Sequence, residues 1–263
     1  MNVLYCKWGS ICEKGIDNGL VALGHHITRM TDSFETVDYD TIYATKLSNT
    51  LQKSHYDFVI SVTYIPIISR VCNIHKIPYI SWIVDSPSFS LYSKTIKNAW
   101  NRIFIFDRDL FNKFYPENPT CIFHMPLACD IDTWDSIIPS DSERNMYSCD
   151  ISFIGSLYSE KCRYNSIAEQ LPDYMQGYIN GLIAAQENIF GYNLIRDSIT
   201  NDFATEFKTY ADWIPLAEDY TEDTKDIVSD TYIGYKCTEQ DRIRTLNALA
   251  KNHQVHLYTK SDT

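Results

Sequence analysis

The stretch "PYISWIVDSPSFS", residues 78–90, decides the fold that the sequence predicts. Its first part, "PYISWIV", is rich in large apolar side chains and lacks a regular polar alternation. A run of this kind is typical of a strand that is buried on both faces of a parallel sheet. The run ends abruptly at Asp85-Ser86-Pro87, where we expect the chain to leave the core.

Short apolar runs alternate with helix-like segments on both sides of this stretch. This order predicts an α/β fold over residues 1–128, a doubly wound parallel sheet with helices on both faces. In such a sheet, ligands bind beyond the carboxyl ends of the strands. We predict strands at 2–6, around Val37, and at 57–62, 78–84, 102–106 and 120–124, and helices that end near Gly24 and span 42–54, 65–76, 89–99 and 108–115.

Asp85 follows the last apolar residue of its strand, so we expect it at the ligand edge, pointing toward the cleft. Ser86 and Pro87 continue the same loop, which the proline stiffens. The alternative is that Asp85 only caps the helix that follows.

The second half of the chain begins with a linker and then starts a second α/β domain. Residues 129–147 are polar and turn-rich, which is typical of a linker. The second domain takes up residues 148–263, opens with a strand at 149–156 and ends with a strand at 254–259. Between these strands, residues 160–235 are acidic, aromatic and mostly helical in pattern.

The helix "TEQDRIRTLNALAKN" precedes the final strand and carries a predicted buried stripe of Ile243, Leu246 and Leu249. A parallel sheet of two strands cannot bury its faces. We therefore expect the second domain to be truncated, as a fragment of a longer protein. The alternative is that the first domain's sheet or a partner completes it.

Composition and charge exclude several classes of protein. The formal net charge of −11 argues against nucleic-acid binding and against adhesion to anionic membranes. The sequence has no signal-peptide pattern and no apolar run of membrane-spanning length. Eight cysteines without a CxxC pair are interpreted mostly as buried, reduced thiols of a cytoplasmic protein, and no metal site is expected.

Two glycine-bearing loops follow predicted strands. The loop "WGSICEKGIDNG", residues 8–19, places Gly9 and Gly15 near a helix start, which is a generic anion site. Its glycine spacing is not the GxGxxG pattern of dinucleotide-binding proteins. The second loop, "FIGSLYSEKCRYN", contains Gly155, Ser156 and Arg163. Both loops run strand, Gly-Ser, then Glu-Lys, although the glycines could serve only the turns and Arg163 could be ordinary surface charge.

The segment "HMPLACDIDTW", residues 124–134, follows a strand and leads into the linker. We expect His124 and Asp130 to lie at the hinge, lining the interdomain cleft together with Ser86 and Pro87. The alternative role of the segment is purely structural.

The segments "GLVALGHHIT", "SWIVDSP", "IFIFDRDL", "FHMPLACDIDTW" and "DISFIGSLY", in this order, resemble the CgeB-like glycosyltransferases of the GT-B type. The resemblance covers nearly all of residues 1–160 and resumes at 240–260. It implies two Rossmann-like domains facing across a cleft, with residues 165–235 as a helical insertion in the second.

The resemblance also implies an activity. Enzymes of this type move a sugar from a nucleotide-sugar donor to a hydroxyl of a glycan or protein acceptor. For this chain we expect a UDP-, GDP- or dTDP-linked donor. They generally need no essential metal and no further cofactor. Charge on the leaving diphosphate is stabilised by helix N-termini and cations. The predicted base at the acceptor is Asp85, and the predicted phosphate-binding residues are Gly9, Lys14, Gly15, Gly155, Ser156 and Arg163.

Two other functions remain open at this point. A non-catalytic module derived from a glycosyltransferase would bind a sugar or a protein. A dinucleotide-dependent enzyme such as an epimerase is disfavoured because the glycine fingerprint is missing.

Overall fold

The computed structural model describes residues 1–213, 219–221 and 224–261. The chain divides into two units, which are treated separately below. The first contains residues 1–138 and 219–221, and the second contains the described residues of 139–213 and 224–261.

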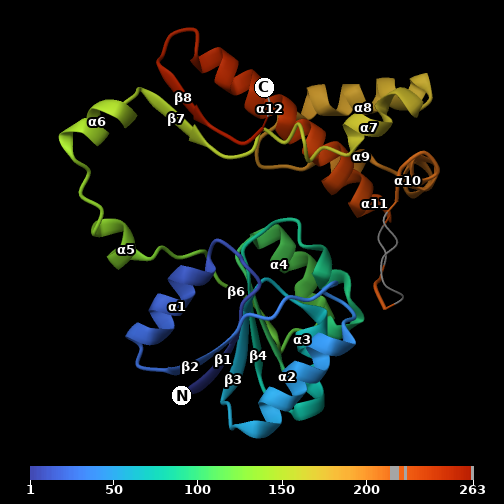
Figure 1. The fold of residues 1–263 in the computed structure, drawn as a ribbon. Helices are drawn as coiled ribbons and strands as arrows, with labels where there is room; N and C mark the ends of the chain where they lie inside the picture. The colour runs from blue at the N-terminus through green and yellow to red at the C-terminus, as the bar shows by residue number, and fades with distance from the viewer. Residues whose placement is uncertain (214–218, 222–223, 262–263) are drawn as a thin grey trace. The chain divides into compact units, whose positions relative to one another are not determined.

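Six parallel strands form the sheet of the first unit, in the order β2-β1-β3-β4-β5-β6 (Figure 1). Each pair of neighbours is parallel, so all six strands end at the same edge. The α/β architecture with a parallel sheet is therefore confirmed for this unit. The strands are β1 Asn2–Cys6, β2 His26–Met30, β3 Phe58–Val62, β4 Tyr79–Ile83, β5 Asn101–Ile105 and β6 Ile122–His124.

Helices cover the two faces of this sheet unequally. Side chains of α2, α3 and α4 join one buried cluster with Leu4 and Ile83, whereas Ile16 and Leu20 of α1 pack on the opposite face against Tyr5. The helical elements of the unit are α1 Glu13–Ala22, α2 Thr41–Lys53, α3 Pro66–His75, the 3₁₀ turns η1 Phe89–Tyr92 and η2 Lys94–Lys97, α4 Arg108–Phe114, the 3₁₀ turn η3 Tyr115–Glu117 and α5 Ile131–Asp135.

Two predicted elements of the first unit are wrong. The second strand is β2, not a strand around Val37, and Val37 instead packs partly buried against the core. β2 escapes detection because it is an edge strand with the polar sequence "HITRM", of which Met30 alone is buried. The predicted helix at 89–99 is two 3₁₀ turns, since Ser93 accepts a hydrogen bond from the Thr95 amide and starts a new turn.

The second unit is mainly helical around a two-stranded parallel sheet. Its buried apolar residues include Met175, Ile179, Phe207 and Ile233, which come from three different helical segments. Its elements are α6 Asp141–Tyr147, β7 Ile151–Ile154, α7 Tyr164–Ile167, the 3₁₀ turn η4 Ala168–Gln170, α8 Asp173–Gln186, α9 Leu194–Ser198, α10 Asn201–Lys208, α11 Thr224–Asp226, the π-helix η5 Ile227–Ile233, α12 Gly234–Leu249 and β8 Val255–Tyr258.

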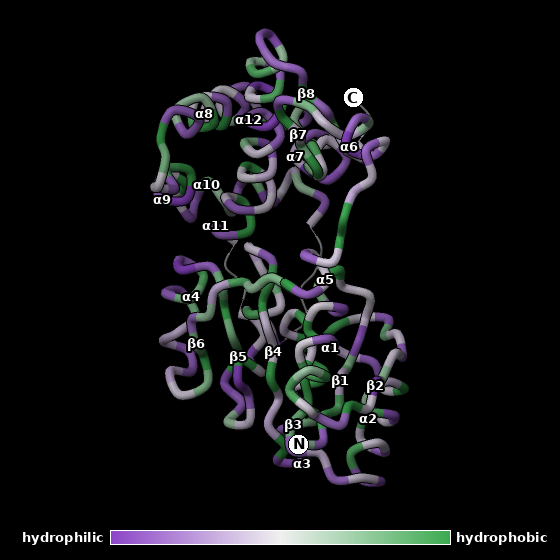
Figure 2. The backbone as a smooth tube through the Cα atoms, turned by 90° about the vertical axis from the view of Figure 1, so that its left-hand side faces the viewer, coloured by the Kyte–Doolittle hydropathy of each residue, from purple (hydrophilic) through white to green (hydrophobic). Residues whose placement is uncertain are grey.

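The predicted buried stripe of α12 is wrong. Ile243 is 38 % exposed, and Leu246 and Leu249 are only half-buried. The helix is largely hydrophilic (Figure 2), and its most buried residue is Glu239. A two-stranded sheet offers a helix little apolar surface, which explains the partial burial. The predicted linker, 129–147, contains α5 and α6, and the two units divide after Ile138.

Candidate functional site at the carboxyl-end edge of the sheet

The direction in which the chain builds the sheet reverses between β1 and β3. From β1 the chain moves to β2 on one side, and from β3 it moves stepwise toward β6 on the other side. The loops after β1 and β3 therefore diverge at this point, which is where open α/β sheets bind ligands. The loop after β4, with Asp85, lies at the same edge.

Trp8 bridges the loops after β1 and β3, at the point where the strand order reverses. Its indole Nε1 donates a hydrogen bond to the carbonyl oxygen of Val62, 2.8 Å away, and links the loop after β1 to the end of β3. The side chain remains 43 % exposed. A half-exposed indole at this edge offers a ligand a flat apolar surface.

Thr63, the first residue after β3, has a left-handed backbone with φ of 64°. This conformation is strained for a β-branched residue and concentrates at functional sites. It is held in place because its amide donates to Trp82 O at 2.8 Å and its carbonyl accepts from Ser61 Oγ at 2.8 Å. Within the described part of the chain, Thr63 Oγ1 and Trp82 Nε1 are buried and have no hydrogen-bond partner.

The amides of the loop after β1 are bonded to the protein's own carboxylate. Glu13 Oε1 accepts from the backbone N–H groups of Trp8 at 2.7 Å and of Gly9 at 3.0 Å. Glu13 is 6 % exposed and begins α1. Gly9 takes a positive φ of 102°, which suits a glycine. The amides that we expected to be free for a phosphate are thus already paired with an internal anion.

Asp85 is exposed and does not cap a helix. The next helical turn starts after Ser88, without a side-chain cap. Asp85 lies close enough to Cys12 to act on it: burial raises the pKa of the Cys12 thiol, and the negative charge of Asp85 raises it further. The structure therefore brings Asp85 to the loop after β1. Ser86 is exposed beside it, and Pro87 is half-buried.

His124 and Asp130 have structural partners. His124 Nε2 donates to Phe106 O at 3.1 Å. Asp130 Oδ2 accepts from Asn18 Nδ2 at 2.8 Å and from the Thr133 hydroxyl at 2.7 Å, and the hydrogen bond from Thr133 is the main reason why the pKa of Asp130 lies below its usual range.

Gly15 of α1 lies opposite Asp130, in the segment after β6. A Cβ at this position would lie 3.4 Å from Asp130 Cβ, which is an ordinary van der Waals contact. The neighbouring Lys14 is exposed, and its positive charge contributes to the low pKa of Asp130. Gly15 and Lys14 thus lie beside Asp130.

In the glycine loop of the second unit, a glutamate of the loop again binds a polar group of the same loop. Ser156 Oγ donates to Glu160 Oε1 at 2.7 Å and accepts from the Tyr158 amide at 2.9 Å. The hydrogen bond from Ser156 is the first cause of the lowered pKa of Glu160. Gly155 follows β7 directly. The sequence motif Gly-Ser then Glu-Lys thus marks loops in which a glutamate binds the polar groups of its own loop.

Arg242 of α12 is the cation that contacts this second loop. The sequence patterns do not predict it. Its guanidinium lies over the rings of Phe153 and Tyr158, 5.6 and 4.7 Å from their centroids, and donates to Ser156 O. The predicted cation, Arg163, is exposed, and its guanidinium makes no hydrogen bond or ion pair to the described residues. The sequence marks Arg242 only by its place on a helix-like segment that precedes a strand.

The sequence matches no protein-family model, and no curated protein is significantly similar to it. Within the described residues, no group of three or more His, Cys, Asp or Glu could hold a metal ion. No helix in the described part of the chain is long and apolar enough to span a bilayer.

Proposed function

We propose that the chain is a glycosyltransferase of the GT-B, CgeB-like type, and that the acceptor binds at the carboxyl-end edge of the first unit. The observation that carries the proposal is the place of Asp85 beside the loop after β1, where the strand order reverses. An exposed carboxylate, a half-exposed indole and a strained threonine lie at the edge where folds of this kind bind their ligands.

In the proposed reaction, an acceptor hydroxyl attacks the anomeric carbon of a nucleotide-sugar. Asp85 accepts the hydroxyl proton, the new glycosidic bond forms, and the bond between the sugar and the diphosphate breaks. The leaving diphosphate carries away the electron pair and needs positive charge nearby. Arg163, whose guanidinium is unpaired among the described residues, is the proposed cation for the donor diphosphate.

The test is a transferase assay combined with a thermal-shift screen of UDP-, GDP-, dTDP- and CMP-sugars. A donor that binds the native state raises the melting temperature. Asp85→Asn should lower the transfer rate by about 100-fold or more if Asp85 is the base. Asp109→Asn is the matched control, because Asp109 is an exposed carboxylate of the same unit without a partner among the described residues.

Failure has two forms. If no nucleotide-sugar shifts the melting temperature and none is turned over, the transferase proposal is wrong. If transfer is observed and Asp85→Asn is as active as Asp109→Asn, the fold assignment survives but the base is another group.

A non-catalytic binding module is the second candidate, and one observation favours it. Glu13 and Glu160 already occupy the polar groups of the two loops that a diphosphate would need. A module of this kind would bind a neutral sugar or a protein and show no turnover. Isothermal titration with free monosaccharides and nucleotide-sugars separates the two functions, because only the transferase requires the nucleotide.

A further inference from the structure

Residues 219–221 belong to the first unit, although residues 139–213 and 224–261 belong to the second. Tyr220 forms an antiparallel bridge with Ser93. On one side of this bridge the Lys94 amide donates to Asp219 O at 2.9 Å, and on the other the Thr221 amide donates to Tyr92 O at 2.9 Å. The segment thus docks as a short added strand, a common mode of peptide recognition.

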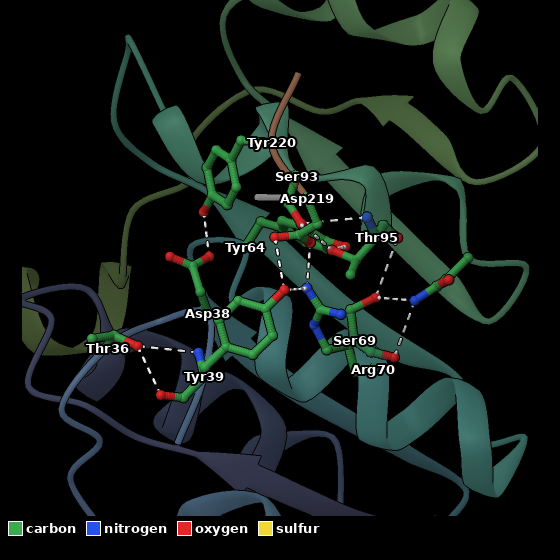
Figure 3. A network of polar contacts seen from close by, with 11 residues as sticks. Thr36, Asp38, Tyr39, Tyr64, Ser69, Arg70, Ser93, Thr95, Asp219 and Tyr220 are labelled. Atoms are coloured by element: carbon green, nitrogen blue, oxygen red, sulfur yellow. Dashed lines mark hydrogen bonds and ion pairs between the residues drawn. The ribbon is translucent and has the colours of Figure 1, made fainter. Parts of the chain in front are cut away.

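The Asp219 carboxylate is the centre of the docked segment (Figure 3). It pairs with the Arg70 guanidinium, and it accepts from Ser93 Oγ at 3.0 Å and from Tyr39 OH at 3.2 Å. Its side chain is 17 % exposed. Hydrogen bonds between ionised partners in such partial burial are stronger than neutral ones.

Arg70 and Asp38 complete the docking surface. The Arg70 guanidinium lies 4.6 Å from the centroid of the Tyr39 ring and donates to its hydroxyl at 3.2 Å. Tyr220 OH donates to Asp38 Oδ1 at 2.5 Å. Burial is the main cause of the raised pKa of both Asp38 and Tyr220.

The surface beneath the segment is held together without it. Tyr64 OH donates to Thr95 Oγ1 at 2.8 Å, and Ser69 Oγ donates to Asn101 Oδ1 at 2.7 Å. The buried apolar cluster of this face includes Leu91 and Ile96 on either side of the bridge but, within the described chain, no residue of 219–221. Docking is therefore mainly polar, and the groups it uses can return to water. Arg70 is already 32 % exposed.

We propose that residues 219–221 form a latch, which docks on the first unit through Arg70 and opens without unfolding the sheet. With the latch closed, Asp219 and Tyr220 are bound to Arg70 and Asp38 of the first unit. With the latch open, Arg70 and Asp38 lose these partners and face water.

Hydrogen exchange on the full chain tests the latch, because two backbone amides report on it directly. Arg70→Gln and Asp219→Asn each remove the ion pair, and exchange at the Lys94 and Thr221 amides should then become roughly 10- to 100-fold faster. The Val59 amide, which donates to Pro78 O inside the sheet, should exchange at the wild-type rate.

Arg29→Gln is the matched control. Arg29 pairs with Asp17 in the same unit, so its loss should leave the Lys94 and Thr221 amides unchanged. Unchanged exchange at these amides in both Arg70→Gln and Asp219→Asn would overturn the proposal. Equal acceleration at Val59 would overturn it as well, since the segment would then be an integral part of the sheet domain.

A milder variant covers the case in which these proteins do not fold. Tyr220→Phe keeps the ring and loses the hydrogen bond to Asp38. Added salt weakens a partly exposed ion pair in the wild-type chain. Faster exchange of the two reporter amides under either condition supports the latch, and no change under both contradicts it.

Discussion

Trp8 Nε1 donates a hydrogen bond to Val62 O, 2.8 Å away, across the point where the strand order reverses. The bond joins two loops that would otherwise separate toward opposite ends of the sheet. It also fixes the half-exposed indole at the proposed ligand edge.

Trp8→Phe should therefore destabilise the protein by about 1 kcal/mol, because it removes one hydrogen bond and keeps most of the apolar contact. Urea unfolding followed by circular dichroism gives the free energy. Trp134→Phe is the control, since Trp134 is 62 % exposed and its indole donates to no described residue. Equal stability of the two variants would mean that the bond to Val62 O contributes nothing.

Glu13→Ala should expose an anion site. The Trp8 and Gly9 amides lose their acceptor, which should cost about 1–3 kcal/mol of unfolding free energy. Inorganic phosphate should restore part of the lost melting temperature in Glu13→Ala and have no such effect on the wild type. Glu35→Ala, at an exposed glutamate, is the control. A phosphate shift of the same size in all three proteins would contradict the internal-anion interpretation.

Asp85→Asn should make the Cys12 thiol more reactive. Burial is the larger cause of its raised pKa, and the charge of Asp85 adds to it, so removal of that charge lowers the pKa and increases the thiolate fraction. Alkylation of Cys12 near pH 8, followed by peptide mass mapping, should be about 2- to 3-fold faster. The exposed Cys129 serves as the internal control. An unchanged rate at Cys12 would show that the two residues are farther apart in solution.

Arg29→Gln should raise the pKa of Asp17. Hydrogen bonds from Arg29, at 2.8–3.0 Å, are the main reason why this pKa is depressed. A depressed carboxyl pKa stabilises the fold above the unfolded pKa of about 3.9, and this contribution is lost as the pH falls through the folded value.

The wild type should consequently lose more stability than Arg29→Gln between about pH 7 and about pH 3. NMR titration of the Asp17 carboxyl and urea unfolding at both pH values measure the effect. Lys46→Gln, which breaks the exposed pair with Asp32, is the comparison. Identical acid profiles for Arg29→Gln and the wild type would refute the assignment.

The sequence predicts the central strands of the sheet well and the edge strand β2 poorly. The segment 78–84 contains β4 within one residue at each end, because a strand covered on both faces must be apolar along its length. β2 was missed because "HITRM" lies at an edge, where polar residues are tolerated. The sequence predicts that the glycines and Lys14 hold a phosphate. In the structure, the amides of Trp8 and Gly9 instead donate to the Glu13 carboxylate.

Long-range polar contacts account for most of what the sequence did not predict. Asp219 and Ser93 are 126 residues apart, and Tyr220 and Asp38 are 182 apart. Periodicity and local motifs cannot predict such a pair, because each partner is an ordinary residue for the segment in which it lies. Glu13 is different: an acid on the first turn of a helix behind a glycine loop was a visible signal for an internal acceptor.

The docked position of residues 219–221 has a practical consequence for dissecting the molecule. A fragment that stops at residue 138 contains the complete six-stranded sheet and leaves Arg70 without its carboxylate partner. A synthetic peptide that carries Asp219 and Tyr220 should complement such a fragment in trans, so the discontinuous half of the protein could be rebuilt from two pieces.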